Sequence, residues 1–216
     1  MTETEHYRAH GYVALKALFP TELLSAFYGR MTDDLAAAGR SMASFKTRGP
    51  LQRDEAIEIY AYQYAPMLAF LWGVTPRMAQ LTGLGLLPTY AYFRAYRVGD
   101  VCRVHSDRPA CEHSLSLTLA SGEDRPWSLS VATGRTDQPR PIVSDDFEGA
   151  AFESVDMLPG NGVAYQGTHR RHGRLDPNPN SWSVHLFMHW VEQGGRYADQ
   201  AFDRPTMQAA GMTPNA

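Results

Sequence analysis

The sequence has 216 residues, of which 44% are hydrophobic and 20% charged, and its formal net charge is −3. This length suits one domain that buries its own core, and the charge balance gives no electrostatic basis for binding nucleic acid or an anionic membrane. Cys102 and Cys111 are too few for a disulfide framework. Because the N-terminus also does not match a signal peptide and no apolar run is long enough for a membrane span, we expect a cytoplasmic protein.

The first third of the chain has the hydrophobic spacing of helices. Apolar residues over 23–35 recur at intervals of three and four, after a turn at Pro20, and predict one amphipathic helix. A second helical region is expected over residues 65–81. Gly73 and Pro76 predict that this region is divided into two short pieces.

After Pro88 the hydrophobic period changes from helical spacing to strict alternation, which is typical of strands. Turn-rich segments separate the strand candidates, which are residues 90–96, 113–120, 127–133, 162–167 and 182–191. Helices followed by many short strands predict an α+β, mainly β fold, with helices packed on an antiparallel sandwich or barrel. We expect a single domain over 1–216, made of a mainly helical buttress (1–87), a β core (88–195) and a peripheral tail (196–216).

A candidate metal site begins directly after the first long strand candidate, at His105 and Asp107. Residues i and i+2 of an extended segment point to the same side, so this imidazole and this carboxylate can converge on one ion. A third ligand is expected from a later strand end, where His169 and His172 follow the strand candidate 162–167. Two imidazoles and one carboxylate on one face leave positions open for a bidentate co-substrate and O2, which suits Fe(II).

Two segments around these histidines resemble the Fe(II)/2-oxoglutarate-dependent dioxygenase superfamily, close to its prolyl-4-hydroxylase-like branch. The first, residues 92–131, contains the pattern Y-x-x-G-x-x-x-x-x-H-x-D at Tyr96, Gly99, His105 and Asp107. The second, LPGNGVAYQGTHRRHGR at 158–174, is similar to the region of the distal histidine, and residues 10–27 resemble the entry to the first helix. The resemblance implies a double-stranded β-helix, or jelly-roll, core with N-terminal flanking helices. It favours His172 over His169 as the distal ligand.

The resemblance also implies 2-oxoglutarate as a co-substrate beside Fe(II) and O2. In many members a basic residue nine to eleven positions after the distal histidine binds its distal carboxylate, but residues 181–183 here are Ser-Trp-Ser. Arg174, Arg94 and Arg108 are the candidate replacements. Tyr92 and Tyr96 alternate in phase with Arg94, so all three are expected on one face of the strand, where the tyrosines can donate hydrogen bonds to a carboxylate.

The function implied by the resemblance is a dioxygenase that hydroxylates an unactivated C–H bond of an amino acid, a peptide or protein side chain, or a small metabolite. His185 and His189, four residues apart on a strand candidate, are expected to point the same way and bind cofactor or substrate, or alternatively a second metal. Two other classes stay open. One is a cupin-like metalloenzyme that does not use 2-oxoglutarate, which the absence of a basic residue at 181–183 favours. The other is a non-catalytic metal-binding module.

Overall fold

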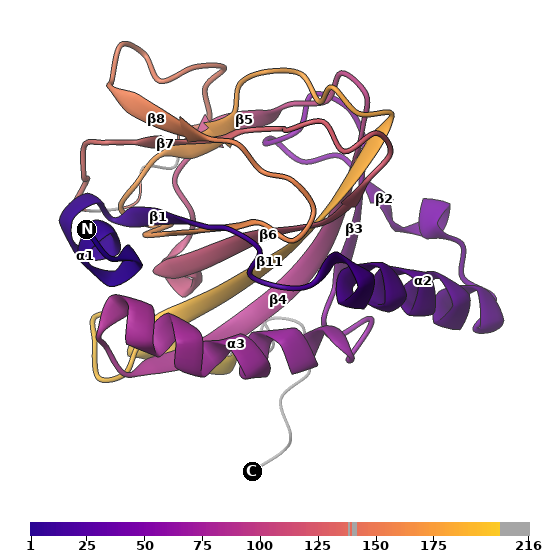
Figure 1. Cartoon of the computed structure of the whole chain (residues 1–216), viewed down its shortest axis with the longest axis horizontal. Coiled ribbons are helices and arrows are strands. Elements are labelled where there is room, and N and C mark those ends of the chain that lie inside the picture. Colours follow the sequence, from indigo (N-terminus) through magenta and orange to yellow (C-terminus); the bar gives the residue numbers. More distant parts are fainter. Residues whose placement is uncertain (138, 140–141, 204–216) are drawn as a thin grey trace.

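Two antiparallel β-sheets face each other in the computed structural model, which describes residues 1–137, 139 and 142–203 (Figure 1). The strands are β1 (Tyr12–Leu15), β2 (Lys46–Thr47), β3 (Ala56–Tyr60), β4 (Leu86–Arg97), β5 (Cys102–His105), β6 (His113–Ser121), β7 (Leu129–Ala132), β8 (Phe152–Val155), β9 (Gly162–Tyr165), β10 (His172–Arg174) and β11 (Trp182–Glu192). The larger sheet has the order β1-β9-β6-β11-β4-β3-β2 and the smaller sheet the order β5-β10-β7-β8.

The chain from β4 to β11 passes repeatedly between the two sheets. β4, β6, β9 and β11 lie in the larger sheet, whereas β5, β7, β8 and β10 form the smaller one. Two four-stranded antiparallel layers connected in this way make a jelly roll. The predicted mainly β fold with a double-stranded β-helix core is therefore confirmed.

The two faces of the larger sheet differ in chemistry because side chains alternate along each strand. On β6, Leu115, Leu117 and Leu119 belong to the main hydrophobic core beneath the helices. The residues between them, Ser114, Ser116 and Thr118, are equally buried but point toward the smaller sheet. Leu129 and Val131 of β7 form a second apolar cluster with Val163 of β9 in part of the space between the sheets. The hydroxyl groups of β6 are the polar groups on this side that can bind ligands.

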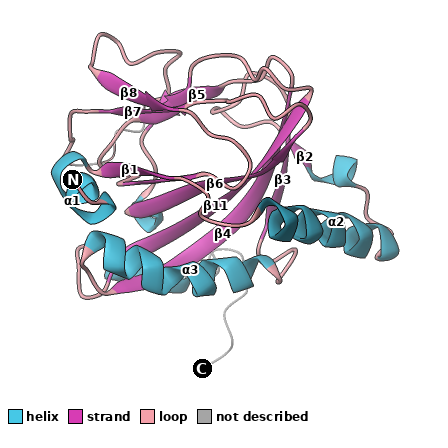
Figure 2. Ribbon diagram, in the orientation of Figure 1, coloured by secondary structure: helices cyan, strands magenta, loops and turns pink. Residues whose placement is uncertain are grey.

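Helices cover the outer face of the larger sheet (Figure 2). These are α1 (Glu3–His10), α2 (Thr21–Ala37) and α3 (Met67–Thr82). The described chain also forms the short 3-10 helices η1 (Met42–Phe45), η2 (Pro109–Cys111) and η3 (Ala198–Asp203). α2 confirms the helix predicted over 23–35, and its Leu24, Met31 and Leu35 are buried. No helix in the described part of the chain is long and apolar enough to cross a membrane.

The predicted division of the second helix is wrong, because α3 runs unbroken through Pro76. The apolar residues of α3 keep helical spacing across the proline, and Leu71, Val74 and Met78 are all buried in the core. Pro76 is itself exposed, so its ring and the missing hydrogen bond fall on the solvent side. Burial of the opposite face thus outweighs the local preference for a break.

The region 1–87 holds more than helices. β1, β2 and β3 lie within it and extend both edges of the larger sheet, whereas the strand candidates of the sequence begin only after Pro88; β1 falls in the segment 10–27 that resembles the entry to the first helix. α1 was not predicted either, although Thr2 and Glu5 form a capping box at its start. Of the tail predicted over 196–216, residues 198–203 form η3, and residues 204–216 lie outside the described residues.

Candidate metal centre

Three side chains converge at one end of the space between the sheets. His105 is the last residue of β5, Asp107 follows it by two positions, and His172 is the first residue of β10. Because β5 and β10 pair with His172 opposite His105, the two rings lie with centroids 4.4 Å apart. The Nε2 atoms of His105 and His172 lie 3.4 Å and 3.5 Å from Oδ1 of Asp107. A cross-strand pair therefore brings together residues that are 67 positions apart in the sequence.

Backbone hydrogen bonds orient both imidazoles. Nδ1 of His105 lies 2.8 Å from the carbonyl oxygen of Arg103, and Nδ1 of His172 lies 2.9 Å from that of Arg170. Carbonyl oxygens only accept, so each Nδ1 carries the proton and each Nε2 presents its lone pair toward Asp107. This is the tautomer that a metal-binding histidine needs.

The charges at the site favour an ionised carboxylate between two imidazoles. Burial opposes ionisation of Asp107, but the neighbouring His172 and His105 hold its pKa well below the usual range. For His105, burial and the nearby His172 lower the pKa. For His172, burial acts in the same direction, but Asp107 outweighs it and the pKa is raised.

The distances between the donor atoms fit a metal ion. Adjacent ligands of an octahedral ion with bonds of about 2.1 Å lie roughly 3 Å apart, so Nε2–Oδ1 distances of 3.4–3.5 Å fit a small transition-metal ion.

The position of Asp107 depends on a glycine. The Asp107 amide donates to the carbonyl oxygen of Gly167 at 2.9 Å. A Cβ atom at position 167 would collide with Oδ2 of Asp107 and with Oγ of Ser114. Ser114 in turn donates to Oδ2 of Asp107 at 3.2 Å. Gly167 therefore provides the space into which the carboxylate fits.

The competing histidine has a different environment. Nδ1 of His169 is hydrogen-bonded to the carbonyl oxygen of Thr136 at 2.8 Å, and its ring lies near Tyr197. Among the described residues, His169 belongs to neither group of side chains that is arranged to hold a metal. The structure thus places His172, and not His169, beside His105 and Asp107.

Tyr92, Arg94 and Tyr96 share the inner face of β4, as their alternation predicts. The charge of Arg94, however, is already neutralised. Its Nη2 lies 2.6 Å from Oε1 of Glu58 on β3, and its Nη1 donates to the Tyr96 hydroxyl at 2.9 Å. Arg108 likewise forms an ion pair with Asp203, at 2.9 Å.

Arg174 is different, because it is buried without an acidic partner. Its side chain is 1% exposed and stacks on Trp127, with the guanidinium carbon 4.5 Å from the ring centroid. It donates to the Trp127 carbonyl oxygen, to Sδ of Met157 at 3.2 Å and to Nδ1 of His185 at 3.3 Å. No carboxylate of the described chain pairs with it, and burial lowers its pKa. A buried cation without a counter-ion is costly, so this position favours an anionic ligand.

Residues 181–183, where a basic residue was expected, hold no cation. Ser183 on β11 is buried, and its hydroxyl is hydrogen-bonded to Asn178 at 3.0 Å and to His185 Nε2 at 3.1 Å. The sequence pattern does not identify Glu58, because the short strand β3 lies in a region dominated by helical spacing, and the pattern assigns no role to Ser114 or Trp127. The strict alternation around Ser114 was a signal that its hydroxyl points inward.

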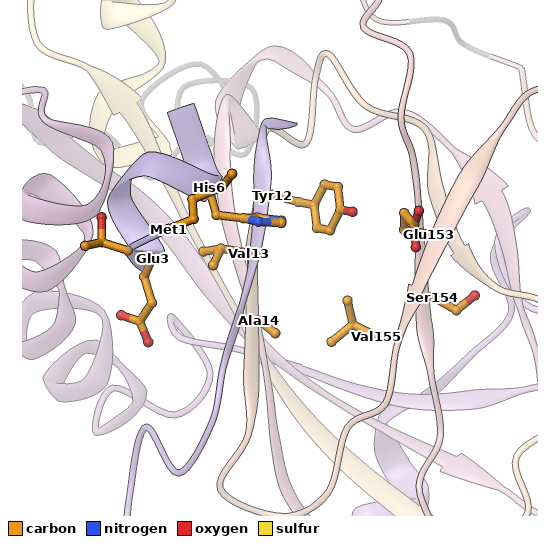
Figure 3. Close-up of a pocket in the computed structure, with 10 residues that line it drawn as sticks. Met1, Glu3, His6, Tyr12, Val13, Ala14, Glu153, Ser154 and Val155 are labelled. Carbon is orange, nitrogen blue, oxygen red and sulfur yellow. The ribbon is translucent and has the colours of Figure 1, made fainter. Parts of the chain in front are cut away.

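A separate hollow of about 360 Å³ lies where the edge strands β1 and β8 approach each other beside α1 (Figure 3). Tyr12 projects from β1 toward Glu153 of β8, and the His6 ring packs edge to face beside it. None of the three converging side chains lines this hollow.

Comparison of the sequence with models of protein families finds no match, and comparison with curated protein sequences finds none either. The fold does have solved counterparts. SnoK, a non-haem α-ketoglutarate-dependent carbocyclase from nogalamycin biosynthesis, has a TM-score of 0.67 and 12% identity, over 88% of this chain and 83% of that one. A Pseudomonas putida prolyl-4-hydroxylase has a TM-score of 0.58 and 16% identity, over 88% of this chain and 97% of that one. HygX from Streptomyces hygroscopicus, solved with nickel and 2-oxoglutarate, has a TM-score of 0.62 and 10% identity, over 89% of this chain and 88% of that one.

At these identities the likeness establishes a shared fold. The jelly roll implied by the resemblance in sequence is the fold of these solved structures. What the fold is used for in this chain must be argued from its own residues.

Proposed function

We propose that this protein is a non-haem Fe(II)- and 2-oxoglutarate-dependent oxygenase. Its reaction is the hydroxylation of an unactivated C–H bond in an amino acid, a peptide or protein side chain, or a small metabolite. The observation that carries the proposal is the convergence of Nε2 of His105, Nε2 of His172 and Oδ1 of Asp107. Two imidazoles and one carboxylate on one face are the donor set typical of non-haem Fe(II), and they leave coordination positions open. Neighbours of the same fold solved with Fe3+ or nickel and the co-substrate support this by analogy.

His105, Asp107 and His172 would hold the ion. Together with 2-oxoglutarate, Fe(II) supplies the activation of O2 that oxidises a C–H bond, while the co-substrate becomes succinate and CO2. The protein's own task is to hold the ligands in place, orient both substrates and exclude water. Ser114 and the two backbone carbonyls that orient the imidazoles perform the first part of this task.

The distal carboxylate of 2-oxoglutarate is assigned to Arg174. This guanidinium lies on β10, two residues after His172, and lacks an acidic partner in the described chain. A carboxylate would neutralise its charge and accept charge-assisted hydrogen bonds. Tyr96, whose ring meets that of Trp127 edge to face at a centroid distance of 4.9 Å, is the nearby hydroxyl donor. Arg94 instead orients Tyr96 and is held by Glu58.

A cupin-like metalloenzyme that does not use 2-oxoglutarate is the second candidate. The observation that favours it is Ser183, which occupies the region where a basic residue is usual and whose hydroxyl is satisfied by protein partners. Release of succinate during turnover distinguishes the two functions.

The direct test is an anaerobic titration of the protein with Fe(II) and 2-oxoglutarate. The two together are expected to produce a weak charge-transfer band in the visible spectrum. His105→Ala and Asp107→Ala are expected to abolish it while the protein stays folded. Absence of the band in the wild-type protein, at saturating Fe(II), would overturn the assignment of the co-substrate.

A further inference from the structure

One ring nitrogen beside the candidate metal centre has no hydrogen-bond partner among the described residues. His189 on β11 is 2% exposed, and its Nε2 atom forms no hydrogen bond within the described chain. The ring lies close to the candidate ligands, since His189 and Asp107 offer donor atoms within 4.8 Å of each other. A buried polar atom without a partner costs free energy, and at a ligand-binding site it indicates a group that the ligand supplies.

The hydrogen bonds of Ser114 determine which ring nitrogen of His189 carries the proton. Oγ of Ser114 lies 2.9 Å from Nδ1 of His189, 3.2 Å from Oδ2 of Asp107 and 3.3 Å from the carbonyl oxygen of Cys111. The hydroxyl has one proton, and the carboxylate and the carbonyl can only accept it. Ser114 therefore accepts from His189, which places the ring proton on Nδ1. Nε2 is then a lone-pair acceptor that requires a donor.

A wall of tyrosines leads from this nitrogen to the surface. We define the tyrosine wall as Tyr60, Tyr62, Tyr90 and Tyr92. Tyr62 is 62% exposed, and its ring centroid lies 5.4 Å from that of Tyr60. Across the β3–β4 pair, the ring centroids of Tyr60 and Tyr92 are 5.3 Å apart. The centroid of Tyr90 lies 6.0 Å from that of Tyr92 and 4.6 Å from that of His189. Interplanar angles of 14–22° along the wall keep the tyrosine rings nearly parallel. Another planar ring can extend such an arrangement.

The charged groups beside the wall are already paired. Arg94 is neutralised by Glu58, and Arg108, whose guanidinium carbon lies 4.3 Å from the Tyr90 ring centroid, is paired with Asp203. At its exposed end the wall offers the ring of Tyr62, and at its buried end it offers the acceptor Nε2 of His189. This combination suits a neutral ring compound better than a charged peptide segment.

We infer that the primary substrate is a small molecule with a planar ring that lies along the tyrosine wall and a hydroxyl or amino group that donates to Nε2 of His189. The inference rests on the proposed function, since it places the substrate beside the metal ligands. It narrows the substrate from three classes to one, a ring-bearing metabolite.

The test compares two ring compounds, 2-naphthol and 2-methoxynaphthalene, by ligand-detected NMR on the full chain, at low concentration and with the same small fraction of organic cosolvent. Both have the ring, but only the naphthol has a donor. We expect the naphthol to bind at least about tenfold more tightly, because the ether leaves the acceptor unpaired. His189→Phe keeps an aromatic ring and is expected to erase the difference. Tyr62→Ala, at an exposed position, is expected to weaken binding of both compounds.

Three results would overturn the inference. They are equal affinity for the two compounds in the wild-type protein, a difference that survives in His189→Phe, and tighter binding of an acetylated proline-containing peptide than of either ring compound. The first comparison needs no variant and so does not depend on whether His189→Phe folds. Titrations with and without Fe(II) and 2-oxoglutarate separate a failure of this inference from a failure of the proposed metal chemistry.

Discussion

His105 and His172 occupy opposite positions on the paired strands β5 and β10, and their rings lie with centroids 4.4 Å apart. Strand pairing thus sets the spacing of two ligand atoms, and the third comes from Asp107 in the segment that follows β5. Each imidazole is fixed by a hydrogen bond to a backbone carbonyl two residues earlier in the chain. The site is therefore organised by the backbone of the smaller sheet before any ion binds.

The first prediction concerns the choice between the two distal histidines. His172→Ala removes one of three protein ligands, and we expect the affinity for Fe(II) to fall at least about a hundredfold. His169→Ala is the matched control, because that imidazole is bonded to the Thr136 carbonyl and lies outside the ligand set. Anaerobic calorimetry measures both. Equal losses in the two variants would contradict the assignment of His172.

The second prediction tests the space occupied by the Asp107 carboxylate. In Gly167→Ala, the new methyl group meets Oδ2 of Asp107 and Oγ of Ser114, so the carboxylate must move. We expect Fe(II) affinity to fall about tenfold to a hundredfold, which is the range for perturbing a group that orients a ligand. Gly134→Ala is the control, since a Cβ there meets nothing within 4 Å. Wild-type metal affinity in Gly167→Ala would show that the carboxylate does not depend on this gap.

The fold and the convergence of His105, Asp107 and His172 follow more directly from the sequence than the choice among the candidate arginines does. The alternation of polar and apolar residues on β4, β6 and β11 is strong because one face packs on helices and the other faces the polar interior. The His-x-Asp spacing places two side chains on one side by local geometry alone. These features depend on near neighbours in the chain, and local pattern is sufficient to detect them.

The anchor depends on long-range contacts, which the local pattern does not contain. From the sequence, Arg174 is the nearest candidate and Arg94 and Arg108 are further ones; the structure distinguishes them because Glu58 neutralises Arg94 and Asp203 pairs with Arg108. Glu58 lies on β3, a strand of five residues in a region dominated by helices, so the local sequence pattern does not reveal its ion pair with Arg94. The continuity of α3 through Pro76 was missed for the same reason, because burial of the opposite face decided it.

The third prediction tests Arg174 as the anchor for 2-oxoglutarate. Arg174→Gln removes the buried positive charge and keeps one N–H donor group on a shorter side chain. We expect the dissociation constant for 2-oxoglutarate, measured anaerobically with Fe(II) bound, to rise about a hundredfold, because a desolvated charge pair is lost. Fe(II) affinity itself is expected to stay within about threefold of wild type. The same substitution at Arg125, which is outside the site, is the control.

An unchanged affinity for 2-oxoglutarate in Arg174→Gln would assign the anchor elsewhere. A loss of Fe(II) binding in the same variant would instead mean that Arg174 supports the fold of β10. Thermal unfolding of the variant separates this second outcome from a specific effect on the co-substrate.

The last prediction concerns the stability of the fold at low pH. His113 is 4% exposed and lies 2.7 Å from the Tyr7 hydroxyl of α1, and burial together with the nearby His169 lowers its pKa from 6.5 to about 4. Between these two values the unfolded chain binds more protons than the folded one, so the stability contributed by neutral His113 is lost as the pH falls. In His113→Asn this loss is absent. We therefore expect the wild-type protein to lose about 3 kcal/mol more unfolding free energy than the variant between about pH 7 and about pH 4. Urea unfolding at several pH values measures this difference, and parallel pH profiles for the two proteins would show that His113 is not buried in its neutral form.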